Sequence, residues 1–208
     1  VLDDLGPSER VRDVVALLEE RRLEAETGEF VLWRDRVPAT SVSRLIEDPS
    51  GFALDMRRPV PQAPSAGASL GTIFHAWAER QLHQASGELW DEPIVGEDSL
   101  DEEGRERLAR MKENFAALDI VRNGRPLAIE EPFALEVAGI SVTGRIDAVF
   151  EDADGRIVVV DWKSGIAPTS RTDASTLRYF ATQLRLYRSA WSAVHGTSEG
   201  EIRALVAF

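Results

Sequence analysis

Two aspartates and a lysine stand at the ends of apolar stretches in residues 144–165, which read GRIDAVFEDADGRIVVVDWKSG. Side chains of a β-strand alternate between its two faces, so Asp161 and Lys163 should project together while Trp162 points to the other side. The turn residues DADG join the two apolar runs into a hairpin. Asp147 can therefore meet Asp161 and Lys163 at the ends of neighbouring strands.

Paired carboxylates beside an ammonium group suit the hydrolysis of a phosphodiester. The carboxylates hold a hard divalent cation such as Mg²⁺, which polarises the phosphate and lowers the pKa of a bound water. A nearby lysine orients that water or neutralises developing charge. The alternative is a buried or half-buried Asp–Lys pair that only closes a strand, and a D-x-K tripeptide by itself is a weak signal. The second aspartate and the apolar run favour a site, since unpaired charge there would be costly.

The pattern around these residues predicts an α+β fold. From residue 127 onward the apolar residues alternate with a period of two, which indicates three antiparallel strands in succession. A helix over 175–194, ended by Gly196, then crosses over to a fourth strand at 201–208. We expect a mixed β-sheet in the order β-β-β-α-β, flanked by helices and by an N-terminal helical half.

Residues before 127 have mainly helical spacing. We expect helices from Ser8 to about Arg22, from Thr40 or Ser41 to Glu47, over 51–58, from Ser69 to 85, and over 101–118. Residues 29–33, EFVLW, are typical of a short strand. A proline-rich connector follows at 59–68.

Composition limits the class of protein. The 208 residues are 43% hydrophobic and 29% charged, which is enough for one sizeable core. There is neither an apolar run of membrane-spanning length nor a signal peptide. With no cysteine, disulfides, thiolate metal sites and a cysteine nucleophile are excluded, so a metal must be held by oxygen and imidazole. The chain begins at Val1 and stops within an apolar run, so we expect a fragment of a longer protein.

The charge is unevenly distributed. The net charge of −12 argues against nucleic-acid binding, because phosphate binding depends on lysine and arginine. Residues 87–106 hold nine acidic side chains and one basic one, and we interpret them as a solvated surface segment. Residues 161–191 hold five basic and two acidic side chains. We expect any polyanion to bind on this C-terminal side.

Four ordered motifs resemble a known family. GRIDAVF, VVVDWKSG and QLRLY, together with an upstream G-x-x-x-H in GTIFH, are similar to the RecB-type branch of the PD-(D/E)XK nuclease superfamily. Its members are nuclease domains of bacterial recombination helicases of the RecB, AddAB and AdnAB kinds. The context LGTIFHAWAE is most similar to the C-terminal domains of actinobacterial-type UvrD/RecB/AdnAB-like helicase-nucleases. The resemblance implies a PD-(D/E)XK (restriction-endonuclease-like) core. It covers residues 38–208 and leaves 1–37 as a segment that leads in from a helicase region.

The resemblance implies a role for each matching residue. The catalytic residues would be Asp147, Asp161 and Lys163, and the metal ligands His75, Asp147, Asp161 and the backbone carbonyl of Trp162. The family's Q-x-x-x-Y motif falls on Gln183 and Tyr187, which would position DNA or the active-site strand. The local charge balance, rather than the family, makes Arg178, Arg185 and Arg188 candidates for phosphate contacts, although exposed helical arginines are more often simply solvated.

Two of these positions, His75 and Tyr187, have a competing structural explanation, and so does Glu131 ahead of the first aspartate. His75 could be a core histidine, but a helical wheel places it outside the apolar face of its helix. Tyr187 belongs to the apolar stripe of its helix, so packing explains most of its presence. Glu131 could be a second-shell or second-metal carboxylate or an edge-strand charge beside Pro132, and we favour the edge-strand explanation.

The resemblance implies a Mg²⁺- or Mn²⁺-dependent deoxyribonuclease domain for double-strand-break repair and recombination in the bacterial cytoplasm. Its partners would be DNA, a helicase motor in the same polypeptide and a partner subunit, with no membrane. Some relatives hold an iron-sulfur cluster, which the lack of cysteine excludes here. Two alternatives stay open, a catalytically inactive DNA-binding or structural module of a helicase, and hydrolysis of a small phosphoester.

Overall fold

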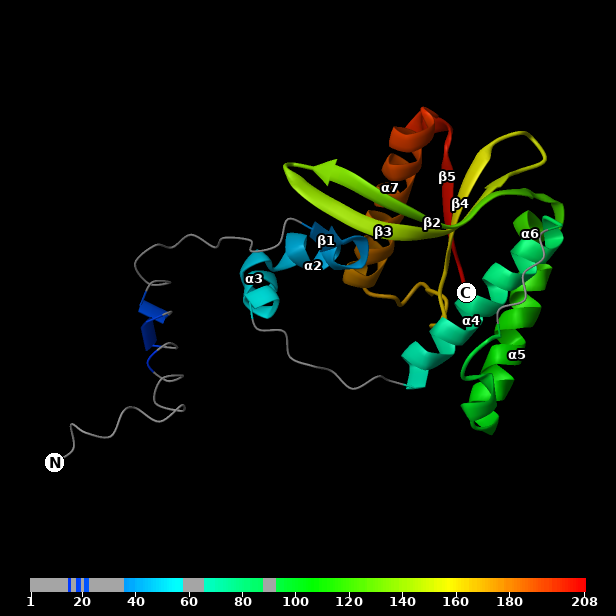
Figure 1. Ribbon diagram of the computed structural model, residues 1–208, viewed down its shortest axis with the longest axis horizontal. Coiled ribbons are helices and arrows are strands. Elements are labelled where there is room, and N and C mark those ends of the chain that lie inside the picture. Colours follow the sequence, from blue (N-terminus) through cyan, green and yellow to red (C-terminus); the bar gives the residue numbers. More distant parts are fainter. Residues whose placement is uncertain (1–14, 16–17, 20, 23–35, 58–65, 88–92) are drawn as a thin grey trace.

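The fold was taken from a computed structural model that describes residues 15, 18–19, 21–22, 36–57, 66–87 and 93–208. The predicted strand at 29–33 and most of the predicted helix at 8–22 lie outside these residues. The described part is an α+β fold built on one five-stranded mixed sheet (Figure 1). This confirms the predicted fold class.

The sheet has the predicted connectivity and one further strand. Its strands are β1 (Arg36–Pro38), β2 (Arg125–Val137), β3 (Ile140–Glu151), β4 (Ile157–Trp162) and β5 (Arg203–Ala207). β2, β3 and β4 are antiparallel neighbours, and the helical crossover makes β5 parallel to β4. The strand missed by the sequence analysis is β1, which pairs in parallel with β3. β1 includes residues on both sides of the domain boundary predicted at residue 38. Arg36 and Val37, which precede that boundary, therefore pair with β3 and belong to the sheet.

The helices also follow the sequence signals closely. They are α2 (Val42–Glu47), α3 (Pro49–Arg57), α4 (Ala66–Ala85), α5 (Glu102–Ala117), α6 (Asp119–Asn123) and α7 (Ala174–His195). Asp101 and Asp173 cap α5 and α7 by accepting a backbone N–H, and Gly196 ends α7 with a φ of 71°. α4 begins before the predicted Ser69, and α6 was not predicted. None of the helices in the described ranges is long and apolar enough to cross a membrane.

Helices cover both faces of the sheet. α7 lies on one face, where Leu186, Ala190 and Trp191 form a buried cluster with Val149 and Val159. α4 and α5 lie on the other, where a second buried cluster includes these residues: Leu70, Phe74, Leu108, Phe115, Val158, Val160 and Trp162. β4 is thus enclosed on both sides, which explains its unbroken apolar run. At about 1.5–3 kcal/mol for each fully buried large side chain, the two clusters dominate the stability of the sheet.

One edge of β3 is shared by two strands, with a break between them. β1 pairs with Ser141–Thr143, and β4 pairs from Ala148 onward, so residues 144–147 lie between the two partners. A Cβ at Gly144 would lie 2.8 Å from the ring of Phe133, so a side chain there would force the ring or the strand to shift. The break places Asp147 where the strands diverge.

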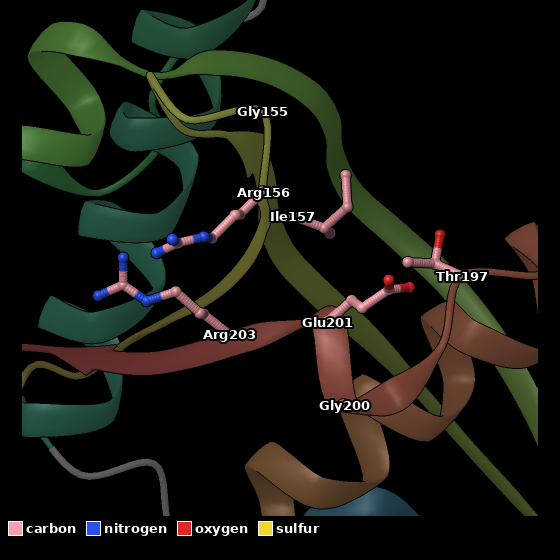
Figure 2. A pocket seen from close by; sticks show the side chains of 7 residues that line it. All are labelled: Gly155, Arg156, Ile157, Thr197, Gly200, Glu201 and Arg203. Atoms are coloured by element: carbon pink, nitrogen blue, oxygen red, sulfur yellow. The ribbon is translucent and has the colours of Figure 1, made fainter.

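The other end of β4 carries a hollow of about 650 Å³ at the starts of β4 and β5 (Figure 2). Arg156 and Arg203 line it, but Arg156 lies 3.7 Å from Asp154 and Arg203 lies 3.4 Å from Asp152. The positive charge of the hollow is therefore balanced by neighbouring carboxylates. The residues predicted to do chemistry lie at the opposite end of the strand.

Candidate active site

His75 is brought to the sheet by a close approach of α4. A Cβ at Gly71 would lie 3.0 Å from the Oγ of Ser164, the residue after Lys163. The glycine of the G-x-x-x-H motif therefore lets the helix pack against the segment that carries the lysine. His75 follows one turn later, with 32% of its side chain exposed, whereas Ile73 and Phe74 on the apolar face are buried. The helical-wheel placement of His75 outside the core is confirmed.

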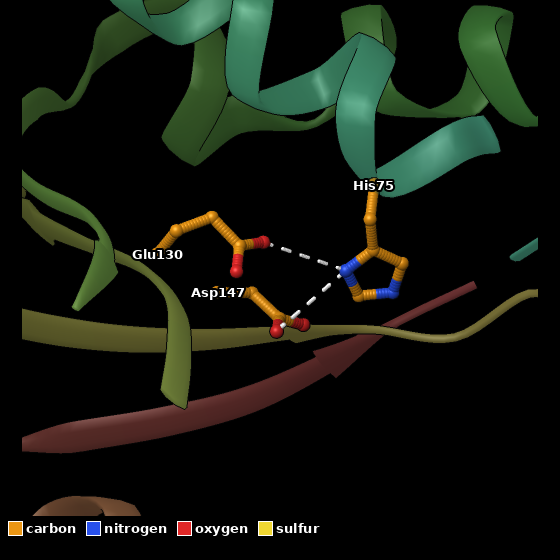
Figure 3. A group of neighbouring side chains, drawn as sticks. All are labelled: His75, Glu130 and Asp147. Atoms are coloured by element: carbon orange, nitrogen blue, oxygen red, sulfur yellow. Dashed lines mark ion pairs between the residues drawn. The ribbon is translucent and has the colours of Figure 1, made fainter. Parts of the chain in front are cut away.

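Three potential metal donors converge at this point. Nδ1 of His75 lies 3.7 Å from Oε1 of Glu130 and 3.7 Å from Oδ1 of Asp147 (Figure 3). One donor atom from each of these residues lies within 4.8 Å of the other two. The two carboxylates reach the histidine from neighbouring strands, because Glu130 on β2 stands opposite Asp147 on β3 between the paired positions 129–148 and 131–146.

Glu130, rather than Glu131, is the glutamate at this site. Its neighbour Glu131, the candidate from the sequence, stands opposite Ile146 in the strand register. Glu130 has a positive φ of 50°, a conformation that few residues other than glycine adopt. Carboxylates directly opposite each other in a sheet repel. The strained backbone at Glu130 holds two carboxylates close together, and both features cost stability. Such an arrangement is typical of a functional site.

The regular alternation of β3 is interrupted at the same place. Ile146 belongs to the cluster beneath α7, whereas Ala148, two residues further on, belongs to the cluster beneath α4 and α5. Strict alternation would place these two side chains on one face, so β3 departs from it between Ile146 and Ala148. The switch coincides with the break between β1 and β4 and leaves Asp147 between the two clusters.

Asp147, Asp161 and Lys163 come together as the hairpin predicted. Asp147 and Asp161 are buried, with 8% and 2% of their surface exposed. Oδ2 of Asp147 accepts the backbone N–H of Trp162 at 2.7 Å. Nζ of Lys163 lies 2.9 Å from Oδ2 of Asp161, and 22% of the lysine side chain is exposed. The ring of Trp162 points away, with its centroid 5.1 Å from that of Phe115.

Burial opposes ionisation of the two aspartates, while Lys163 lies beside Asp161 and the exposed Arg145 lies 3.5 Å from Glu130. Burial raises the pKa of Asp147 to about 7, although His75 and the Trp162 N–H oppose this shift. Burial also raises the pKa of Asp161, against the opposing charge of Lys163. Burial lowers the pKa of His75, but the carboxylates of Glu130 and Asp147 outweigh it and the net shift is upward. A metal ion at this position would favour the ionised form of these buried aspartates.

Comparison with known proteins identifies the family of this chain. The sequence profile of the PD-(D/E)XK nuclease superfamily matches residues 37–208. The chain belongs to this superfamily. A search of curated proteins returned no match. Twelve chains of solved structures match the superfamily domain. One is titled "Crystal structure of SSO0001", is 17% identical, and aligns over 86% of this chain and 68% of its own with a TM-score of 0.35.

The donor set of this PD-(D/E)XK domain fits a hard divalent cation. Ligands about 2.1 Å from an octahedral ion lie about 3 Å apart when adjacent and about 4.2 Å apart when opposite. The separations of 3.7 Å around His75 exceed the adjacent value by about 0.7 Å, so small side-chain movements would be needed to bring these donors to one ion. Imidazole with carboxylates suits Mg²⁺ or, more readily, Mn²⁺. Ligation by Asp161 and by the carbonyl of Trp162 stays a prediction, because the converging group consists of His75, Glu130 and Asp147.

The Q-x-x-x-Y motif of the domain is not on the surface. Gln183 and Tyr187 have 3% and 4% of their surface exposed, and Nε2 of Gln183 donates to the Tyr187 hydroxyl at 2.7 Å. Their predicted role, to position DNA or the active-site strand, stays a prediction. Burial and the nearby Asp161 carboxylate raise the pKa of Tyr187.

The predicted phosphate-binding arginines lie on the exposed side of α7. The side chain of Arg178 is 64% exposed, with Nε 3.7 Å from a carboxylate oxygen of Glu47, and Arg185 is exposed as well. Arg188 donates to the carbonyl of Glu199 instead. Contact of Arg178 and Arg185 with DNA stays a prediction.

Proposed function

We propose that this chain is a divalent-metal-dependent deoxyribonuclease domain that hydrolyses phosphodiester bonds of DNA. The observation that supports it best is the convergence of His75, Glu130 and Asp147, next to a buried Asp161 paired with Lys163. In a domain that had lost its activity, substitutions of these buried charged residues by neutral ones would be favoured, because they would make the fold more stable. The intact cluster therefore favours catalysis over the inactive alternative.

Each residue has a defined part in this proposal. His75, Glu130, Asp147 and Asp161 would hold the ion, together with the carbonyl of Trp162. When bound, Mg²⁺ or Mn²⁺ supplies charge stabilisation at the phosphate and acidifies a water. Lys163, held by Asp161, places its ammonium where it can orient the attacking water or offset charge that develops on the phosphate oxygens. Gln183 and Tyr187 would support the strand that carries Asp161.

The finer proposal places the domain in the RecB-type branch. The G-x-x-x-H motif supports this branch, since Gly71 lets α4 approach Ser164 and His75 belongs to the converging group. The Q-x-x-x-Y motif supports it through the sequence match, and its two side chains are hydrogen-bonded to each other. The domain, residues 38–208 with β1 added at its start, would receive DNA strands from a helicase motor in the same polypeptide, with a partner subunit. It would act in double-strand-break repair and recombination in a bacterial cytoplasm.

Cleavage of a labelled single-stranded oligonucleotide in Mg²⁺ or Mn²⁺ tests this function. Wild-type protein should cut the strand, and chelation with EDTA should stop the reaction. Asp161→Ala should lose at least about 10²-fold in rate, the scale of removing one preorganised group from an active site. Binding of the same oligonucleotide, followed by fluorescence anisotropy, should be retained.

The matched control is Asp152→Asn, which changes an aspartate of the β3–β4 turn at the far end of the strand. It should cut at the wild-type rate. The assignment fails if Asp161→Ala cuts as fast as wild type, or if wild type shows no metal-dependent cutting while it binds DNA.

A further inference from the structure

One stripe of α7 continues past the end of the sheet. Gln183, Leu186 and Ala190 lie on this stripe and are buried against the sheet. Tyr179 lies on the same stripe, one turn earlier, but is only half-buried. β4 ends at Trp162, and Tyr179 stands beside the next residue, Lys163. The tyrosine ring thus occupies the place where the core of the domain opens into the active site.

The ring is held close to the reacting groups. Its centroid lies 5.9 Å from Nζ of Lys163, the same nitrogen that pairs with Asp161. The ring of Phe180 supports it in an edge-on contact with 5.5 Å between centroids, and Phe208 packs edge-on against Phe180 at 5.7 Å. A partly accessible aromatic ring is therefore braced by apolar neighbours at the edge of the proposed phosphate position.

We propose that Tyr179 is a positioning residue that stacks on the base next to the scissile phosphate, so that the site selects unpaired strands. The proposal rests on the nuclease function proposed above. A phosphate between the metal position and Lys163 would bring the adjoining nucleotide to the tyrosine ring. Stacking on an aromatic side chain serves any base, but only one whose face is free. In a duplex, neighbouring base pairs cover both faces of each base.

Charge on the same helix agrees with a strand at this position. Arg178 and Arg185 are exposed on α7, and their helix carries the tyrosine. A basic path for the backbone beside an aromatic platform for the bases is the usual arrangement of single-strand binding sites. Simple core packing would also bury part of Tyr179, but it would make cleavage indifferent to whether a base is present on the substrate.

A single abasic nucleotide in the substrate separates these explanations. A single-stranded DNA oligonucleotide would carry one abasic position, moved along the strand in a series, and would be cut by the 208-residue chain in Mn²⁺. Cutting at the phosphodiester next to the abasic position should slow about tenfold, within the range that one base–aromatic stack supplies. Bonds further away should be cut at the rate seen in the intact strand.

Two variants assign this effect to the ring. Tyr179→Leu should cut intact and abasic strands at similar rates, whereas Tyr179→Phe, which keeps the ring, should retain the tenfold difference. The control is Leu177→Ala, which removes a side chain that is 47% exposed and lies on the opposite side of α7. Thermal stabilisation by Mn²⁺ should be equal in all four proteins, showing that the metal site is intact.

The proposal is overturned if wild type cuts next to the abasic position as fast as elsewhere, or if Tyr179→Leu keeps the tenfold difference. Wild type and Tyr179→Phe decide the question should the leucine variant not fold. An absence of Mn²⁺-dependent cutting by wild type is a different result, because it refutes the nuclease function on which the stacking proposal rests.

Discussion

Replacing Asp147 by asparagine should reveal how much the active site costs the fold. Asparagine keeps the shape of the side chain and can still accept the Trp162 N–H, but it carries no charge. Burial raises the pKa of Asp147 from its ordinary 3.8 to about 7. At about 1.4 kcal/mol per pH unit, the ionised carboxylate is disfavoured in the folded protein by on the order of 4 kcal/mol.

The direction of the pH effect on stability depends on whether the folded or the unfolded protein binds the Asp147 proton more tightly. The folded protein holds the Asp147 proton to a higher pH than the unfolded chain, so this group stabilises the fold at low pH. That contribution falls as pH rises from about 4 through about 7. Between pH 5 and pH 8.5, wild type should lose about 3 kcal/mol of unfolding free energy through this group. Asp147→Asn should not lose it.

Urea unfolding in EDTA, followed by circular dichroism at both pH values, measures this difference. Relative to wild type, Asp147→Asn should gain about 3 kcal/mol between pH 5 and pH 8.5. Mn²⁺ at a hundred times its Kd should stabilise wild type by about 2.7 kcal/mol and the variant by much less. Glu136→Gln, an exposed position on β2, is the control and should follow wild type. A stability gap between Asp147→Asn and wild type that is equal at the two pH values would refute this account of the site.

Two further predictions concern glycines that let other groups approach. Gly71→Ala should lower the free energy of unfolding by about 1 kcal/mol and slow cleavage, because its Cβ would meet the Oγ of Ser164. The double variant with Ser164→Ala should recover both stability and rate. Thermal unfolding and cleavage rates measure the two effects. Gly144→Ala should cost about 1–3 kcal/mol, because its Cβ would lie 2.8 Å from the Phe133 ring; equal Tm values for variant and wild type would contradict this.

Local patterns were enough to predict most of the sheet and the central site residues. Asp147, Asp161 and Lys163 lie in strands with strong alternation, joined by a turn of only a few residues, so their meeting follows from one hairpin. His75 required a tertiary contact between α4 and the sheet, which the resemblance supplied and the glycine spacing explains.

The features that were missed depend on contacts distant in sequence. β1 has three residues, too few for a period to show, and it exists because Val37 is buried against β3. The sequence does not show which of the adjacent glutamates 130 and 131 faces the site. The choice depends on the positive φ of Glu130, and nothing in a pair of identical residues indicates that backbone conformation. Burial of Gln183 and Tyr187 follows from how α7 packs on the sheet, and helical spacing alone does not fix the depth of that packing.

The backbone N–H of Lys163 donates to the carbonyl of Ala207 at 2.8 Å, so the ladder between β4 and β5 extends to the lysine itself. Many enzymes carry such a residue on a loop and must immobilise it as the substrate binds. Here the main chain beneath the ammonium is already fixed, and only side-chain torsions remain to be ordered. Preorganisation of this kind lowers the entropic part of the activation barrier before any substrate arrives.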